Sequence, residues 1–313
     1  MLSTTSYPPF ATSNPNLAKL SWYPGHMAKA LRSIDNQLTS VDAVVEIRDA
    51  RIPFSSANHQ FDEMVQARNK PRLIVLTKSD LTDLTSQTKI QQIFANRGMS
   101  STYTIATRPK NVKRIIAKAV KGVKMKFKVS AALLLVVGMP NAGKSTLINT
   151  LRTGAVVGSK GNEKIGKRKS KVAKTGALPG ITRQVSSIQV VNSPAVYVLD
   201  TPGIMVPKVD DMETGLKLGL TGALPEKIID SETMVEYLLW VLNREHQEGT
   251  NSCLSSKCWD VLGVGSPTSD VQHVLESVAA RYGKNLLTND SALFCLSSYR
   301  KGLLGNMCLD KID

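Results

Sequence analysis

The chain has 313 residues, of which 42% are hydrophobic and 21% are charged, so it can build a sizeable buried core and is not an intrinsically disordered protein. Its apolar runs are far shorter than the roughly 18 residues that a membrane-spanning helix needs, and we expect no transmembrane span. The formal net charge of +15 favours a polyanionic partner.

The first twenty residues contain three prolines, no acid and one cation, Lys19. Transit peptides are also poor in acids and rich in serine, but they carry arginines that this segment lacks. The composition therefore leaves a targeting role open. We expect residues 1–21 to be a disordered or targeting segment.

Apolar residues at steps of four and three predict an amphipathic helix over residues 27–41. Short strands and helices then alternate, which predicts a mostly parallel sheet with helices on both faces. The predicted strands are residues 41–47, 72–77, 101–106, 133–137, 184–191 and 195–199, and the predicted helices between them include residues 86–97 and 111–120. Beyond Pro207 the pattern predicts only helices, at residues 231–243, at residues 270–282 and near Ala292, so we place a small all-α domain over residues 208–313.

The strongest functional signal is Gly138-Met-Pro-Asn-Ala-Gly-Lys-Ser-Thr146, which matches G-x-x-x-x-G-K-[ST] between a predicted strand and a helix-like segment. In such a P-loop the backbone N–H groups face the phosphates, Lys144 reaches the β- and γ-phosphates, and the Ser145 hydroxyl binds Mg²⁺. The P-loop residues expected to bind the nucleotide are Asn141, Ala142, Gly143, Lys144, Ser145 and Thr146.

A second motif, Asp200-Thr-Pro-Gly203, directly follows the predicted strand 195–199. An aspartate at this position can hold the Mg²⁺ shell, and the backbone N–H of Gly203 can bind the γ-phosphate. The tetrapeptide alone is common. After a P-loop and at a strand end, it predicts a nucleotide-sensing switch.

A third motif, Thr77-Lys-Ser-Asp80, ends the predicted strand 72–77 and resembles the guanine-reading N-K-x-D motif of GTPases. In that motif the acid accepts hydrogen bonds from guanine, and the lysine stem stacks on the base. Thr77 replaces asparagine and lacks its amide, and the alternative is an ordinary T-x-x-D helix cap. A later loop around Ala106 can read guanine O6 with its backbone. The expected base-side contacts are Thr77, Lys78, Ser79, Asp80 and Ala106.

The order of these motifs is unusual, because the base motif precedes the P-loop. Such a circular permutation leaves a GTPase site intact, since both loops lie at the carboxyl ends of strands in one sheet. The chain resembles the circularly permuted ribosome-biogenesis GTPases, the group of bacterial ribosome biogenesis GTPase A (YlqF) and mitochondrial ribosome-associated GTPase 1. Four further stretches carry the resemblance: Trp22-Tyr-Pro-Gly-His-Met-Ala-Lys-Ala30, Asp49-Ala-Arg-Ile-Pro53, Pro179-Gly-Ile-Thr-Arg183 and Tyr299-Arg-Lys-Gly-Leu-Leu-Gly305.

The resemblance implies a circularly permuted P-loop GTPase domain over residues 22–207 and a helical rRNA-docking domain over residues 208–313. It also implies that the switch I threonine Thr182 closes on Mg²⁺ and that Asn141 helps to bind a catalytic K⁺. The implied partners are rRNA and the large ribosomal subunit or its precursor, and we expect a monomer off the ribosome.

Many GTPases carry a water-orienting glutamine after the D-x-x-G glycine, but this chain has Ile204, which has no polar side-chain atom. The family assigns the missing role to the histidine that matches His26. The alternative is that His26 is only a structural residue at the start of the first helix. We take His26, Lys144 and Thr182 as the expected catalytic residues.

Positive charge is concentrated in residues 84–199, which hold twenty-one lysines and arginines but one acid, Glu163. Many of these cations precede Thr182, so an ordered switch can present them to rRNA. The alternative is a solvated surface that serves only solubility. The expected RNA-binding residues are Lys164, Lys167, Arg168, Lys169, Lys171 and Lys174.

The spacing of Cys253, Cys258, Cys295 and Cys308 matches neither a tight zinc pair nor a dense disulfide framework. We interpret them as reduced thiols, mostly in a core. A zinc site that uses Cys253, Cys258 and His246 or His273 is the less favoured alternative.

We therefore expect an enzyme that hydrolyses GTP with Mg²⁺ and K⁺ and acts in assembly of the large ribosomal subunit. The resemblance implies a mitochondrial protein, in the matrix or peripheral on the inner membrane, or a cytoplasmic one in a bacterium. One rival is a non-catalytic, nucleotide-stabilised rRNA-binding scaffold, which Ile204 favours. The other is a permuted ATPase, which Asp80 disfavours.

Overall fold

The structure, a computed structural model, describes residues 7–11, 25–121, 123, 131–156, 187–192, 195–200, 209, 211–249, 257–283 and 288–312. Contacts divide the chain into two compact units. The sheet unit consists of Pro24–Ser79 and Thr88–Pro207. The helical unit consists of Met1–Tyr23, Asp80–Gln87 and Lys208–Asp313.

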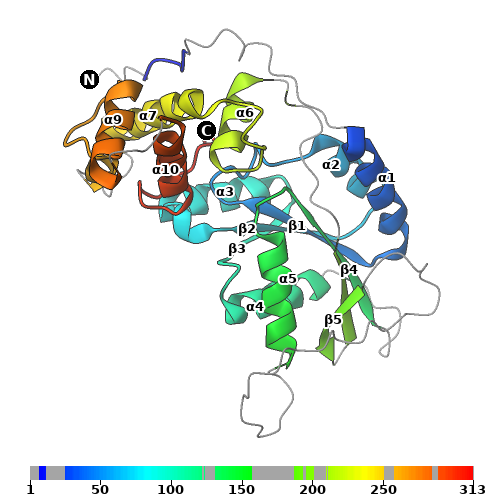
Figure 1. Ribbon diagram of the computed structural model, residues 1–313. Coiled ribbons are helices and arrows are strands. Elements are labelled where there is room, and N and C mark those ends of the chain that lie inside the picture. Colours follow the sequence, from blue (N-terminus) through cyan, green and yellow to red (C-terminus); the bar gives the residue numbers. More distant parts are fainter. Residues whose placement is uncertain are drawn as a thin grey trace, which may run out of the picture. The chain divides into compact units, whose positions relative to one another are not determined.

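The sheet unit is built on a six-stranded sheet with the strand order β3-β2-β1-β4-β6-β5 (Figure 1). Strands β1, β2, β3, β4 and β6 run parallel, and β5 pairs antiparallel with β6 at one edge. Every residue of the central strands β1 and β4 is buried, as expected for parallel strands covered on both faces. The strands are β1 (Ala43–Asp49), β2 (Arg72–Thr77), β3 (Ser100–Tyr103), β4 (Ala132–Gly138), β5 (Ser187–Asn192) and β6 (Ala195–Asp200).

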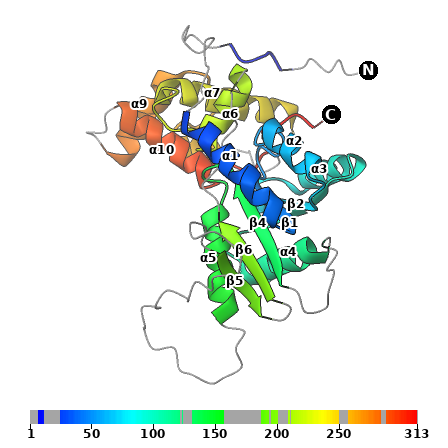
Figure 2. The same ribbon diagram turned by 90° about the vertical axis from the view of Figure 1, so that its right-hand side faces the viewer.

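Helices cover both faces of this sheet (Figure 2). On one face, α1 (Gly25–Ser40) and α2 (His59–Ala67) pack on the sheet, and on the other lie α4 (Pro109–Lys121) and α5 (Lys144–Val156). Helix α3 (Leu84–Asn96) connects β2 to β3 along the chain. The core under α1 and α2 contains Leu31, Ile34, Leu38, Phe61, Val65, Val44, Leu135, Val137 and Leu199.

The helical unit packs around α7 (Ser231–Glu248), its longest described helix, which contacts α6 (Met212–Leu220), α9 (Val271–Tyr282) and α10 (Thr288–Arg300). The Asp230 side chain caps the start of α7 by accepting a hydrogen bond from the backbone N–H of Thr233, and Gly249 ends the helix in the left-handed region. The short helix α8 (Lys257–Leu262) packs against α9.

The predicted class, a mostly parallel sheet with helices followed by a helical C-terminal region, is confirmed. Three helices were not predicted: α2, α6 and α8. Helix α2 buries only Phe61 and Val65, too few apolar positions to show a helical period in the sequence. Within the described part of the chain, no helix is both long and apolar enough to cross a bilayer.

Three of the four cysteines, Cys258, Cys295 and Cys308, are buried free thiols, as predicted; Cys253 lies outside the described residues. Burial raises the pKa of Cys258 to about 11 and that of Cys295 to about 12. These two thiols are therefore protonated and weakly nucleophilic at neutral pH.

Candidate nucleotide-binding site

Three loops follow the carboxyl ends of neighbouring parallel strands of the sheet. Strand β1 pairs with β2 on one side and with β4 on the other, and β3 pairs with β2. The Thr77–Asp80 motif follows β2, the P-loop follows β4, and the loop that contains Ala106 follows β3. This edge of a parallel sheet is where ligands bind in α/β folds.

The P-loop needs its glycines for steric reasons. A Cβ atom on Gly138 would lie 2.5 Å from the carbonyl oxygen of Ile47 on β1, closer than real Cβ atoms come to other atoms. Asn141 and Gly143 both adopt left-handed backbone conformations, with φ of 58° and 88°. Alternation of this kind turns successive N–H groups toward one side of the loop, which is how a backbone cradles phosphate.

The P-loop ends at the N-terminus of α5, which begins at Lys144. Lys144 is buried, while Ser145 and Thr146 in the first turn are exposed. The N–H groups of the first turn and the positive end of the dipole of a 13-residue helix suit an anion at this point.

The hydroxyl of Thr77 links the base motif to the P-loop. Thr77 is completely buried, and its Oγ1 atom donates a hydrogen bond to the carbonyl oxygen of Ala142, at 2.5 Å. A Cβ atom on Gly143 would lie 3.5 Å from this Oγ1 atom and 3.8 Å from the Cβ of Ala106. Threonine in place of asparagine thus makes a direct bond to the P-loop, and Ala106 lies beside the same glycine.

The next residue, Lys78, also has a left-handed backbone, with φ of 55°. Its Nζ donates to Oδ2 of Asp49 at 2.8 Å, and the backbone N–H of Ser79 donates to the carbonyl oxygen of Thr104 at 3.3 Å. Asp80 follows in the short 3₁₀ turn Ser79–Leu81, with its side chain exposed. The motif is therefore held through Lys78 and Ser79, and the Asp80 side chain, the predicted base reader, is open to solvent.

Asp49, for which the sequence motifs predict no role, holds Lys78 of the base motif. Its carboxylate accepts from the backbone N–H, Nε and Nη2 of Arg51 as well as from Lys78. Burial alone would raise the pKa of this carboxyl, but Arg51 and Lys78 outweigh burial and hold the pKa at about 2. The available signal was its position at the end of β1, between the strands that carry the two motifs.

A second buried ion network joins Glu46 and Arg48 on β1 to Arg72 at the start of β2. Glu46 pairs with Arg48 at 2.7 Å and with Arg72, which also pairs with Asp62. Burial opposes ionisation of Glu46, but the two arginines lower its pKa below the usual value. This network fixes charged residues inside the sheet unit, away from the loops that follow β2 and β4.

Two of the three predicted magnesium ligands have a described backbone. Ser145 offers an exposed hydroxyl at the start of α5. Asp200 ends β6, which pairs with β4 so that Asp200 lies opposite Val136, two residues before Gly138. A hydroxyl and a carboxylate oxygen are hard donors of the type that Mg²⁺ prefers, so these residues fit the ion.

Several predicted site residues lie outside the described residues. For His26, at the start of α1, and for Asp200, only the backbone is described. The others that lie outside are Thr182, Gly203, Ile204 and the predicted RNA-binding residues Lys164, Lys167, Arg168, Lys169, Lys171 and Lys174.

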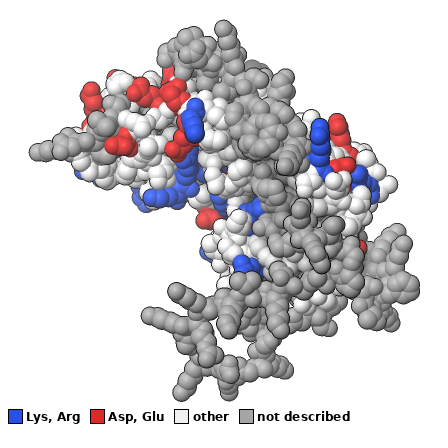
Figure 3. Space-filling view, turned by 45° about the vertical axis from the view of Figure 1, so that its right-hand side comes forward, with Lys and Arg blue, Asp and Glu red and all other residues white. Residues whose placement is uncertain are grey.

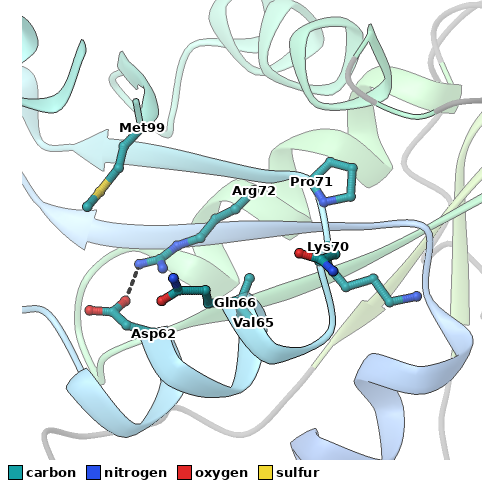
Figure 4. A pocket seen from close by; sticks show the side chains of 8 residues that line it. Asp62, Val65, Gln66, Lys70, Pro71, Arg72 and Met99 are labelled. Carbon is teal, nitrogen blue, oxygen red and sulfur yellow. Dashed lines mark hydrogen bonds and ion pairs between the residues drawn. The ribbon is translucent and has the colours of Figure 1, made fainter. Parts of the chain in front are cut away.

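A cavity of about 470 Å³ between α2 and the start of β2 lies at the opposite edge of the sheet (Figure 4). Arg72, the first residue of β2, points into it and pairs with Asp62 at 2.5 Å. Arg72 is already paired with two carboxylates, and the Nζ of Lys70, the other cation lining the cavity, donates to the carbonyl oxygen of Val41. The cavity is not part of the nucleotide site.

Comparison with known proteins agrees with this geometry. A family model described as "50S ribosome-binding GTPase" matches residues 134–257. Mitochondrial ribosome-associated GTPase 1 of Mus musculus is 38% identical over 315 residues, which cover 93% of this chain and 90% of the relative. Ribosome biogenesis GTPase A of Bacillus pumilus is 35% identical over 237 residues, covering 73% of this chain and 77% of the relative.

Among solved structures, GNP-bound YlqF from T. maritima superposes with a TM-score of 0.56 and 25% identity, covering 91% of this chain and 99% of that one. Identity and coverage of this extent show kinship over nearly the whole chain. The chain belongs to the family of circularly permuted GTPases that contains mitochondrial ribosome-associated GTPase 1 and ribosome biogenesis GTPase A.

Proposed function

We propose that the protein binds and hydrolyses GTP while associated with the large ribosomal subunit of mitochondria, and that it acts in assembly of that subunit. The observation that carries the proposal is the bond from Thr77 Oγ1 to the Ala142 carbonyl oxygen, which joins the base motif to the P-loop. Two loops that are sixty-odd residues apart in sequence are thereby joined directly at the carboxyl ends of the strands. The names of the relatives, "mitochondrial ribosome-associated" and "ribosome biogenesis", support the partner and the compartment.

Each site residue has a defined task in this proposal. Asp80 accepts hydrogen bonds from guanine and Lys78 covers the base, with Ser79 and Ala106 beside it. Lys144 and the P-loop backbone bind the β- and γ-phosphates. Ser145, Thr182 and Asp200 hold Mg²⁺, which when bound neutralises charge on the phosphates, and Asn141 contributes to a K⁺ site. Gly203 offers its backbone N–H to the γ-phosphate.

Contact with rRNA is supported by the basic block in residues 84–199. Within the described residues, α4 exposes a row of cations on the side away from its buried face: Lys110, Lys113, Arg114 and Lys121. Residues 200–313 instead hold ten cations against sixteen acids, and Figure 3 shows acidic side chains spread over the helices at the upper left. Electrostatic attraction to rRNA therefore comes mainly from the middle of the chain, with residues 208–313 proposed as a shape-specific docking domain.

The rival function, a nucleotide-stabilised scaffold without turnover, is favoured by Ile204 at the position of the water-orienting residue. GTP turnover measured with and without purified large ribosomal subunits separates the two functions. We expect slow turnover alone and a strong stimulation by the subunits in Mg²⁺ and K⁺. Tight GTP binding without stimulated turnover would support the scaffold instead.

Three further experiments test the nucleotide preference, the cellular compartment and the oligomeric state. ATP is expected not to displace a fluorescent GTP analogue, because Asp80 excludes adenine. Fractionation of cells is expected to place the protein in mitochondria, in the matrix or on the inner membrane, and sedimentation without ribosomes is expected to give a monomer.

A further inference from the structure

A groove on the helical unit is occupied by a segment of the chain itself. The space left beside this segment has a volume of about 350 Å³ and is lined by α6, α7, Lys311 and the segment itself. Figures 1 and 2 both show this N-terminal segment, in dark blue, beside the yellow α7. The segment reads Tyr7-Pro-Pro-Phe10, and its two aromatic residues are half-buried while the two prolines between them are exposed.

A hydrogen bond and edge-on ring contacts join the segment to α7. The indole Nε1 of Trp240 donates a hydrogen bond to the carbonyl oxygen of Pro8 at 3.0 Å. The Tyr7 ring meets Trp240 edge-on at 5.8 Å, and the Phe10 ring meets Tyr237 at 5.2 Å with an angle of 80° between the planes. Edge-to-face pairs at such distances are favourable beyond the burial of their area.

The aromatic platform that the segment contacts is held in place by contacts within α7. Tyr237 and Trp240, one helical turn apart on α7, stack at 5.7 Å with an angle of 16° between their planes. The Arg244 guanidinium, one turn further, lies 5.0 Å from the centre of the Trp240 ring and pairs with Glu245 at 2.9 Å. Tyr237 is fully buried, so the platform is fixed in the core of the unit.

The charges around the groove favour a peptide over a nucleic acid. Glu213 and Glu248 line it together with Arg244 and Lys311, so the four charges balance. A phosphate backbone would gain little electrostatic attraction from a groove whose charges balance. An uncharged sequence of prolines and aromatic residues needs no such attraction and buries no charge there. Aromatic-lined grooves that hydrogen-bond the carbonyl groups of a proline-rich strand are a recurrent mode of peptide recognition.

We propose that this groove is a binding site for a peptide of the type aromatic-Pro-Pro-aromatic, and that residues 7–10 are its occupant in cis. The N-terminal segment is then a structural part of the helical unit. Because an occupant on the same chain acts at a high effective concentration, the groove is closed to a dilute peptide until the segment is released. The proposal does not depend on GTP hydrolysis.

The test uses the full chain and a fluorescent peptide that spans residues 4–14. We expect Tyr7→Ser/Phe10→Ser protein, whose own segment no longer fits, to bind the peptide about tenfold or more tightly than wild type does. The same peptide with Phe10→Ser should not bind, which controls for the sequence specificity of binding. Adding Trp240→Ala should abolish binding, whereas adding Leu303→Ser, at an exposed leucine outside the groove, should not.

Two results would overturn the proposal. One is equal peptide binding by wild type and by Tyr7→Ser/Phe10→Ser protein, because the segment would then not occupy the groove. The other is displacement of the peptide by a short single-stranded RNA but not by unlabelled peptide, which would make the aromatic platform a base-stacking surface.

Discussion

Thr77 illustrates how one residue can depart from a motif and still connect the loops of a site. Its buried Oγ1 atom donates to the carbonyl oxygen of Ala142 and lies 3.1 Å from the carbonyl oxygen of Arg48. A shorter side chain therefore joins β1, β2 and the P-loop. The proposed reader of guanine is the neighbouring Asp80, which is exposed.

Asp80→Asn is expected to move nucleotide preference from GTP toward xanthosine triphosphate. The amide has one acceptor oxygen and one NH2 donor, so it cannot accept from both N1–H and the 2-amino group of guanine, whereas its NH2 can donate to the 2-oxygen of xanthine. Competition binding with the two nucleotides measures the change. Asp83→Asn is the matched control, because this acid three residues later caps α3 by accepting from the N–H of Ser86, which asparagine also does. Unchanged GTP selectivity in Asp80→Asn protein would show that another group reads the base.

His26→Ala is expected to lower ribosome-stimulated GTP turnover by about a hundredfold, the typical contribution of a positioned proton acceptor. GTP affinity should stay close to wild type, since the P-loop and Asp80 are unchanged. His59→Ala, at a side chain that is 93% exposed on α2, is the control. Equal losses of affinity and turnover would make His26 a structural residue.

Asp49 is expected to make stability depend on pH in the acid range. Its pKa of about 2 in the folded state lies below the usual value near 3.8. The contribution of its ion pairs to the free energy of unfolding is therefore complete above about pH 4 and is lost as the pH falls toward 2. The shift corresponds to a contribution on the order of 2 kcal/mol at neutral pH. Urea unfolding from pH 2 to pH 7 should show a smaller acid loss in Asp49→Asn protein. Parallel curves for the two proteins would contradict this.

At the scale of elements, the boundaries that the sequence predicted well are those set by apolar runs. The predicted strand 72–77 matches β2, where an apolar run is bounded by polar residues. The predicted strand 41–47 missed the end of β1, because Arg48 and Asp49 are charged yet buried in ion pairs. Hydropathy cannot foresee such burial, since Asp62, a partner of Arg48, lies on α2, and Lys78, a partner of Asp49, lies in the loop after β2.

The same limit applies to the site. A P-loop is visible in sequence because its glycines and lysine follow one another, and the structure brings it beside Thr77 and Ala106. The role of Asp49 depends on strand order, which places β1 between β2 and β4. The position of the N-terminal segment against Trp240 depends on a contact more than two hundred residues apart in sequence.

The loop after α10 carries another close contact. Gly302 has φ of 79°, and a Cβ atom on it would lie 2.6 Å from Cδ2 of Leu81, the residue after Asp80. The N–H of Met307 in the same loop donates to the Leu81 carbonyl oxygen at 3.1 Å. Within the motif Tyr299–Gly305, position 302 therefore needs a residue without a side chain.

Gly302→Ala is expected to destabilise the protein by about 2–4 kcal/mol, through left-handed strain of about 1 kcal/mol and overpacking against Leu81. Gly249→Ala is the matched control, since Gly249 has φ of 62° but no atom within 4 Å of a Cβ. It should lose only about 1 kcal/mol in urea unfolding. GTP affinity should also fall in Gly302→Ala protein, because Leu81 adjoins Asp80. Equal losses in the two variants would exclude the contact with Leu81.

At the scale of the whole molecule, positive charge is concentrated in the middle of the chain. The basic block coincides with residues 84–199, which include the P-loop and the segment before Thr182, while residues 200–313 are acidic overall. An arrangement in which cations adjoin the nucleotide-sensing switch allows the γ-phosphate to govern contact with a polyanion. A separate set of cations on α4 does not adjoin the switch in sequence.

These two sets should therefore respond differently to nucleotide. Lys167, Arg168, Lys169 and Lys171 changed together to alanine should weaken binding to large ribosomal particles most in the presence of a non-hydrolysable GTP analogue. Lys110, Lys113, Arg114 and Lys121 changed together should weaken it equally with GDP and with the analogue. Each lost phosphate contact removes about one unit from the slope of log affinity against log salt, so co-sedimentation across a salt series measures both effects. If the first set lowers the slope equally in both nucleotide states, its cations bind rRNA without reporting the state of the switch.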